Sequence, residues 1–177
     1  MKRIGLFVLL LLLAALTVAC GLVTTGEEAG AKAGQIAEFT PPEGFTADFS
    51  MDVGGMLMIG YNRADSSDSS GHLFLIQAPE SSGVTTEQLE QSLRDAVASS
   101  QESSAVETTT TEEIPVTIRG EAVTATVGTG TSGDNNRTVR VMTVPFTGNG
   151  GPALLLYQTD EAEWDQAEVD AFLASFR

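Results

Sequence analysis

The chain has few basic residues, and this shortage excludes one class of partner. Nine Lys and Arg stand against 24 Asp and Glu in 177 residues, which gives a formal net charge of −15 at pH 7. Proteins bind duplex nucleic acid by neutralising phosphates with clustered basic side chains, and here those residues are scattered along the chain. We therefore expect no nucleic-acid partner.

The chain also has one cysteine and one histidine. One cysteine permits no disulfide framework, so a core must hold the fold, for which about 140 residues suffice. A zinc site built on several Cys or His ligands is excluded, as is a Cys-His nucleophile pair, because His72 is remote from Cys20. Lys32, the only lysine after Lys2, lies in a polar segment, which argues against Schiff-base chemistry. We expect neither a metal nor a cofactor.

Residues 1–19 have the order of a bacterial export signal. Lys2 and Arg3 precede an almost unbroken apolar run, and the small residue Ala19 stands directly before Cys20. As a helix, residues 4–19 would span roughly 24 Å, short of the roughly 30 Å hydrocarbon core of a bilayer. The length favours a cleaved signal, with an uncleaved anchor and ordinary secretion with a free thiol as the alternatives.

The stretch LTVAC, residues 16–20, resembles the bacterial lipobox. The resemblance implies that a diacylglycerol is attached to the sulfur of Cys20 and that cleavage makes this residue the new N-terminus. Thr17 departs from the pattern, in which leucine or another large aliphatic residue is common. A lone free thiol on an exported protein would be open to oxidation, so acylation explains Cys20 best. Two acyl chains then give a stable lipid anchor in the cell membrane, at its extracytoplasmic face.

Composition divides the chain into a signal peptide (residues 1–19), a lipidated N-terminus with a flexible tether (20–38) and one folded domain (39–177). Residues 21–38 are small and polar with little to bury, which is typical of a tether, although their alanines also permit a frayed helix. Removal of Lys2 and Arg3 with the signal lowers the net charge from −15 by two to −17. The mature protein is therefore strongly acidic.

Hydrophobic periodicity predicts strands and helices in residues 39–177. The apolar runs 55–62 and 71–78 are typical of a β-hairpin. The 3.6-residue period predicts helices at 86–100 and after Asp165, and capping-box spacing marks both starts, Thr85 with Gln88 and Asp165 with Glu168. Further strands are expected at 116–118, 123–127, 138–144 and 153–158, with a turn or bulge at Gly120. Residues 99–111, rich in Ser and Thr, are either a loop or an edge strand.

This order of elements, with Pro-Glu-Gly-Phe at residues 42–45 and Ala-Ser-Phe at residues 174–176, is similar to the PsbP-like fold family. That family includes bacterial exported lipoproteins of the DcrB-like and LpqN-like kinds. The resemblance covers nearly the whole mature domain and implies an α+β fold, in which helices flank an antiparallel β-sheet in an α/β/α sandwich. It carries no catalytic residues to this chain and implies a scaffolding or binding role.

Two stretches imitate ligand-binding motifs. Residues 128–133 match G-x-G-x-x-G, but a dinucleotide fingerprint must open a helix, and here a strand is expected next. Residues 65–71 alternate oxygen ligands like a calcium loop, but Ile76 stands where the twelfth position requires glutamate. Both stretches are interpreted as hairpin loops. The aromatic residues Tyr61, Tyr157 and Trp164 are interpreted as core residues rather than as a ligand surface.

These observations predict a membrane-anchored, non-enzymatic lipoprotein that acts as a binding or scaffolding module at the extracytoplasmic face. Its acidic character predicts a protein partner with a basic surface, attracted by long-range charge. Two alternatives stay open: a cell-envelope hydrolase that uses paired carboxylates, and a carrier of a small ligand or cation. No spacing among the acids selects a catalytic pair, and no G-x-S-x-G elbow marks a nucleophilic serine.

Overall fold

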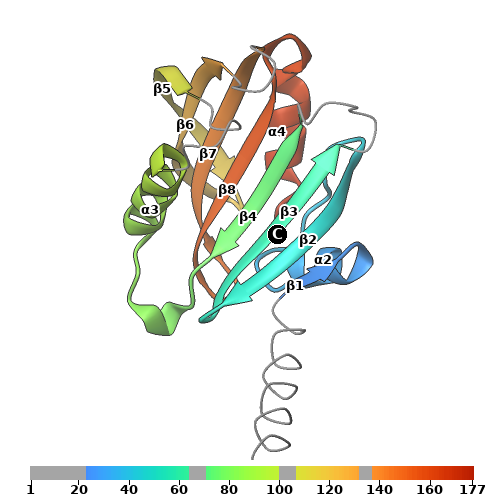
Figure 1. Cartoon of the computed structure of the whole chain (residues 1–177), viewed down its shortest axis with the longest axis vertical. Coiled ribbons are helices and arrows are strands. Elements are labelled where there is room, and N and C mark those ends of the chain that lie inside the picture. Colours follow the sequence, from blue (N-terminus) through green and yellow to red (C-terminus); the bar gives the residue numbers. More distant parts are fainter. Residues whose placement is uncertain (1–22, 64–70, 100–106, 132–136) are drawn as a thin grey trace, which may run out of the picture.

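The computed structural model of the chain describes residues 23–63, 71–99, 107–131 and 137–177 (Figure 1). The predicted signal, Cys20 and most of the calcium-like loop lie outside these ranges. No helix within them is long and apolar enough to cross a lipid bilayer.

Within the described residues, one antiparallel sheet of eight strands forms the body of the domain (Figure 1). Its spatial order is β1-β2-β3-β4-β8-β7-β6-β5, so two four-stranded meanders join where β4 pairs with β8. The strands are β1 (Val23–Thr25), β2 (Phe45–Val53), β3 (Met56–Arg63), β4 (His72–Gln77), β5 (Glu107–Ile118), β6 (Glu121–Thr131), β7 (Thr138–Gly148) and β8 (Gly151–Asp160).

Helices pack on both faces of this sheet. α2 (Glu27–Ala33) and α4 (Gln166–Ala174) cover the side that we call the core face, and α3 (Thr86–Ser99) packs on the opposite side, the α3 face. Side chains alternate along β8, so that Leu155 and Tyr157 join the large core, whereas Leu154 joins a smaller cluster with Leu89 of α3. Two short 3-10 turns, η1 (Glu80–Ser82) and η2 (Glu161–Glu163), follow β4 and β8.

The expected α/β/α sandwich is wrong, because the domain is mostly one eight-stranded sheet and the helices on its two faces are few and short. Among the described residues, the three helices have 7, 14 and 9 residues, whereas β5 to β8 have 10 to 12 residues each. Part of the difference arises in the threonine-rich stretch that opens β5. Its β-branched side chains suit a strand, and β5 pairs with β6 from Glu107 to Ile118 as the edge of the sheet.

The expected flexible tether is also wrong over residues 23–38. β1 pairs with β2 at the opposite edge of the sheet, and α2 follows directly. Ala29, Ala33, Ile36 and Ala37 are at most 3 % exposed. Small side chains let a helix lie close to a sheet, so a segment of low hydrophobicity still packs, and a Cβ added to Gly30 would lie 3.4 Å from Cβ of Ala47.

Several local predictions are confirmed. The capping box of α3 forms, since the Thr85 amide donates to Gln88 Oε1 (3.0 Å) and the Gln88 amide donates to Thr85 Oγ1 (3.3 Å). The register slip around Gly120 is a two-residue hairpin turn, in which Arg119 and Gly120 both have positive φ, at 53° and 77°. The hairpin of β3 and β4 and the closing helix α4 also form.

Candidate binding surfaces

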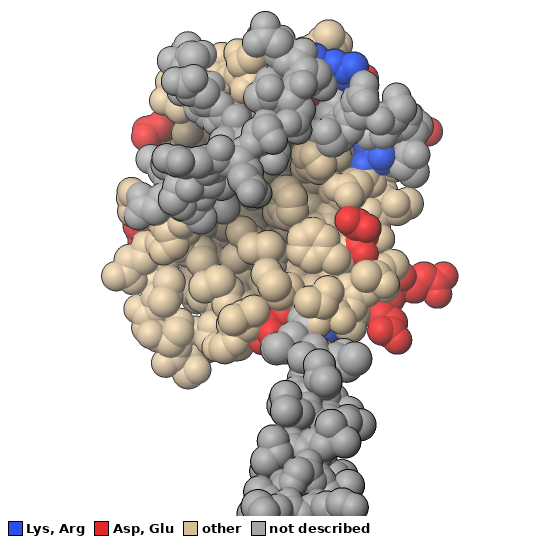
Figure 2. Space-filling model, viewed as in Figure 1, with Lys and Arg blue, Asp and Glu red and all other residues tan. Residues whose placement is uncertain are grey.

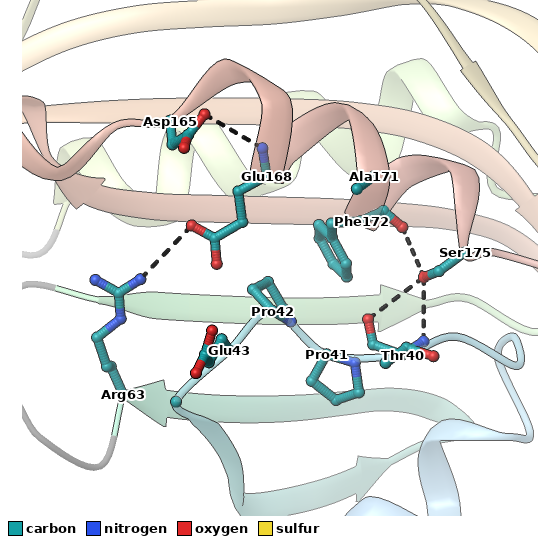
Figure 3. A pocket seen from close by; sticks show the side chains of 11 residues that line it. Thr40, Pro41, Pro42, Glu43, Arg63, Asp165, Glu168, Ala171, Phe172 and Ser175 are labelled. Atoms are coloured by element: carbon teal, nitrogen blue, oxygen red, sulfur yellow. Dashed lines mark hydrogen bonds and ion pairs between the residues drawn. The ribbon is translucent and has the colours of Figure 1, made fainter.

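A cleft of about 820 Å³ lies between α4 and the segment that leads into β2, and we call it the α4 cleft (Figure 3). Two prolines hold the leading segment extended, because their rings fix φ and push each preceding residue to the β region. Gly44, at φ 82°, then turns the chain into β2. The lining residues are Thr40, Pro41, Pro42, Glu43, Gly44, Arg63, Asp165, Glu168, Ala171, Phe172 and Ser175.

Arg63, the last residue of β3, is the basic residue that lines this cleft, and it lies at one end of it (Figure 3). Its Nη1 donates to Glu163 Oε2 at 2.9 Å, and its Nη2 lies 4.0 Å from Glu168 Oε2. Its guanidinium carbon lies 5.2 Å from the ring centroid of Phe45, within the range of a cation–π contact. The side chain is only 15 % exposed, so the carboxylates and the ring hold this cation in one place.

Carboxylates outnumber the cation in the α4 cleft. Three acidic residues line it, and Glu163 borders it through Arg63. Glu163 and Glu168 face the guanidinium, and Asp165 caps α4 by accepting from the amides of Ala167 (2.8 Å) and Glu168 (3.4 Å). Glu43 comes from the opposite wall, on the leading segment (Figure 3). The cleft therefore carries a net negative charge.

The hydroxyl of Ser175 in this cleft serves as a structural link. It donates to the carbonyl oxygen of Phe172 at 2.7 Å and accepts from the amide of Thr40 at 3.1 Å (Figure 3). His72 cannot act as its base, because His72 projects from the α3 face, where its neighbour Phe74 lies, and the sheet separates it from the cleft. On that face Nδ1 of His72 hydrogen-bonds to Asn62 Oδ1 at 2.9 Å. These two residues therefore do not form a nucleophile pair.

The α3 face is apolar over β2, β3 and β4. Phe49, Met51, Met58 and Phe74 are half-buried there, and the register of these strands places them side by side. Figure 2 shows an almost uncharged area over β3 and β4, with carboxylates toward the edge formed by β1 and β2. α3 packs mainly on β7 and β8, and its Leu89 joins a small cluster with Ile76 of β4, against which Met58 packs.

A second hollow, of about 460 Å³, lies beside α2. Its lining is mostly small or aromatic, namely Gly30, Ala31, Ala33, Gly34, Ala37, Glu38, Phe39, Pro41, Phe45, Ala47 and Tyr61. Tyr61 is 4 % exposed, and burial raises the pKa of its hydroxyl to about 12. An apolar hollow of this kind suits a small apolar molecule.

Of the three aromatic residues singled out in the sequence, Tyr61 and Tyr157 are buried in the core, as interpreted, and Trp164 packs partly buried against it. Tyr157 is 2 % exposed, and burial, followed by the charge of Glu168, raises the pKa of its hydroxyl to about 12. Trp164 packs partly buried against Tyr157 at 5.7 Å between ring centroids, and the guanidinium of Arg140 lies 4.7 Å from the Trp164 ring. Lys32 lies in the last turn of α2.

The structure describes only part of each stretch that resembles a ligand-binding motif. Of the G-x-G-x-x-G stretch, residues 128–131 belong to β6 rather than to a loop, and residues 132 and 133 lie outside the described ranges. Nearly all of the calcium-like loop also lies outside them. Within the described ranges, no group of three or more His, Cys, Asp or Glu side chains is placed so that it could hold a metal ion.

No protein-family model matches the chain, and a search of curated protein sequences found no match either. The PsbP-like resemblance therefore stays a prediction.

Sequence reasoning did not find Arg63, since a single arginine at the end of an apolar strand gives no motif. The capping-box spacing of Asp165 with Glu168 explains the cap of α4 but not the ion pairs that Glu163 and Glu168 make with Arg63. The one usable signal was the Pro-Pro-Glu-Gly segment at residues 41–44, whose stiff backbone forms the second wall of the α4 cleft.

Proposed function

We propose that this protein is an exported lipoprotein, anchored by acylated Cys20 at the extracytoplasmic face of the cell membrane, and that it binds a basic protein segment in the α4 cleft without catalysis. One geometric observation carries the proposal. The described chain starts at Val23, which pairs with Met51 near the end of β2, whereas the cleft lies at the start of β2, beside Phe45. Val23, the first described residue after Cys20, and the cleft therefore lie toward opposite ends of the same strand.

The two ends of β2 are far enough apart to keep the cleft away from a bilayer at the Val53 end. Eight residue steps from Phe45 to Val53 cover roughly 26 Å at about 3.3 Å per residue. A lipid attached three residues before Val23 would hold the Val53 end near the bilayer and leave the cleft end directed outward. A partner protein could then reach the carboxylates of the cleft without meeting lipid head groups.

The roles of the carboxylates favour binding over hydrolysis. Glu163 and Glu168 already neutralise Arg63, and Asp165 is committed to the N-terminus of α4. A glycoside hydrolase requires two carboxyl groups placed on either side of the scissile bond. Of the four carboxylates in and beside the cleft, only Glu43 is left for catalysis. All four contribute to the negative potential that attracts a basic segment.

The anchor is tested by the mass of the mature N-terminus. Intact-mass analysis of the protein from bacterial membranes is expected to find a diacylglyceryl group on Cys20 and no residues before it. Cys20→Ser is expected to release the protein from the membrane fraction. A bare thiol on a membrane-bound protein, or continued retention of a trimmed Cys20→Ser variant, would contradict the anchor.

The binding surface is tested by site-specific crosslinking in native membranes. A photo-crosslinking amino acid at position 43, inside the cleft, is expected to form a protein adduct whose yield falls as salt is raised, because screening weakens charge attraction. The same amino acid at position 121, an exposed glutamate of β6 outside the cleft, is the control. Adducts equal at both positions, or insensitive to salt, would rule out the cleft as the binding surface.

The hollow beside α2 supports a second candidate, a carrier of small apolar molecules. A ligand that binds only the folded state raises the melting temperature, by an amount that grows with the logarithm of its concentration relative to Kd. A series of primary alcohols from butanol to decanol is the probe, and an optimum at one chain length is expected. A melting temperature that changes monotonically along the series, as a general solvent effect does, would eliminate this candidate.

A further inference from the structure

We infer that one corner of the sheet, formed by Val23, Val53 and Met56, is a membrane-contact surface on which the anchored domain rests. The inference depends on the lipid anchor of the proposed function. It goes further because it assigns the lipid bilayer as the partner of specific side chains and fixes which end of the domain faces it. The three residues are named together below as the β1–β3 corner.

Exposure singles out these residues. The exposed large apolar side chains of the described ranges are Val23 (52 %), Val53 (58 %) and Met56 (37 %). Large apolar side chains that gather at one exposed place mark a contact with a protein or a membrane.

The strand register brings the three residues together on the α3 face. Val23 pairs with Met51, Val53 pairs with Met56, and Met51 pairs with Met58. Residues two apart in a strand share a face, so Val53 lies beside Met51 on the same side as Val23. Half-buried Met51 and Met58 thus continue the corner inward, and methionine adapts readily to an irregular apolar surface.

The turn between Val53 and Met56 is uncharged and held in place. Gly54 and Gly55 have φ of 62° and 84°, as in a tight hairpin, and the Gly55 amide donates to Asp52 Oδ1 at 3.2 Å. Asp52 pairs with Leu57, a core-face residue, so its carboxylate belongs to the side opposite the corner. The corner therefore presents valine, glycine and methionine, and the Asp52 carboxylate is held against the Gly55 amide of the turn.

Covalent geometry places the lipid beside this corner. Three residue steps separate Cys20 from Val23, and a chain covers at most about 3.6 Å per residue, so the two Cα atoms lie within about 11 Å of each other. An 18-residue tether would have allowed roughly 23 Å of stand-off, but residues 23–38 pack against the sheet as β1, α2 and the buried segment that follows. A diacylglycerol on Cys20 would therefore hold the bilayer next to the corner. For this reason we assign the bilayer as its partner.

The test places a tryptophan in the corner of the full-length, acylated protein reconstituted in phosphatidylcholine vesicles. Brominated acyl chains quench tryptophan only at the depth of the bilayer. Met56→Trp and, independently, Val53→Trp are expected to add emission that brominated lipid quenches strongly. The matched control is Ala162→Trp, at an exposed position of η2 beyond the far end of β8. Its added emission is expected to stay unquenched, like that of the native Trp164.

Each outcome decides the inference. Quenching at positions 53 and 56 but not at 162 supports it. Equal, weak quenching at all three positions in protein that carries the diacylglyceryl mass and stays with the vesicles overturns the membrane contact and leaves the anchor intact. The same weak quenching together with a dimer mass in detergent assigns the corner to a second copy and also overturns it. Absence of the diacylglyceryl mass removes the anchor and the inference together.

Discussion

Phe49 lies against Gly60 directly across the pairing of β2 and β3. A Cβ added to Gly60 would come within 2.5 Å of Cε1 and 2.9 Å of Cζ of the Phe49 ring. Position 60 therefore requires glycine because the Phe49 ring approaches its backbone closely. Its φ is one that any residue can adopt. The ring in turn reaches Phe74 of β4 at 6.3 Å between centroids, so this contact organises the apolar part of the α3 face.

Gly60→Ala is expected to destabilise the domain by roughly 1–3 kcal/mol, because the added methyl group displaces the Phe49 ring. Gly30→Ala is the matched control, since its Cβ would meet only Cβ of Ala47, at 3.4 Å, and alanine favours the interior of α2. It is expected to be neutral or stabilising by up to about 1 kcal/mol. Urea unfolding measures both, and equal destabilisation by the two variants would contradict the packing argument.

Arg63→Ala is expected to cost roughly 1–3 kcal/mol of stability, because it removes charge-assisted hydrogen bonding and the contact with Phe45 from a largely buried side chain. Glu163→Gln is expected to cost less than about 1 kcal/mol, since Glu163 is 47 % exposed and solvent screens the pair. Arg63→Lys keeps the positive charge but replaces the planar guanidinium with an ammonium group, so it tests the contribution of hydrogen-bond geometry. A larger loss for Glu163→Gln than for Arg63→Ala, by chemical denaturation at pH 7, would show that the surface partner dominates.

Stability is expected to fall as the pH rises from about 10 to about 12. Burial raises the pKa of Tyr61 and of Tyr157 to about 12 from 10.0, so the folded protein keeps the two phenolic protons that the unfolded chain releases. The stabilisation is complete below pH 10 and is lost as the pH approaches the folded pKa. Melting temperatures of Tyr61→Phe and Tyr157→Phe should decline less steeply over this interval, and an unchanged slope in both variants would refute the assignment.

Asp165→Ala is expected to destabilise the domain by about 1 kcal/mol, because the amides of Ala167 and Glu168 lose their acceptor at the start of α4. Asp165→Ser keeps an acceptor oxygen at the N-cap and is expected to retain most of the stability. Thermal unfolding of the three proteins at pH 7 is the measurement. Equal losses for alanine and serine would assign the effect to the negative charge rather than to the cap.

Elements defined by neighbouring residues could be predicted from the sequence. The capping box of Thr85 with Gln88 and the cap by Asp165 depend on residues two or three positions apart. The turn at Arg119 and Gly120 depends on two adjacent residues. The α4 cleft was not predictable in this way. Its walls come from residues 40–44 and 165–175, more than 100 positions apart, and Arg63 joins them only because β3 ends there.

The sequence alone determined the acidic character of the protein, its apolar N-terminal run before Cys20 and the positions of its local strands and helices, because charge counts, hydrophobic periods and caps are properties of short stretches. Only the tertiary structure decided that residues 23–38 fold against the sheet and that β4 pairs with β8. Those choices depend on shape, because small alanines bury as well as large side chains where the surface fits them, and the pairing of strands distant in sequence depends on how the whole core packs. The same tertiary arrangement set Val23, Val53 and Met56 at one corner, opposite the cleft.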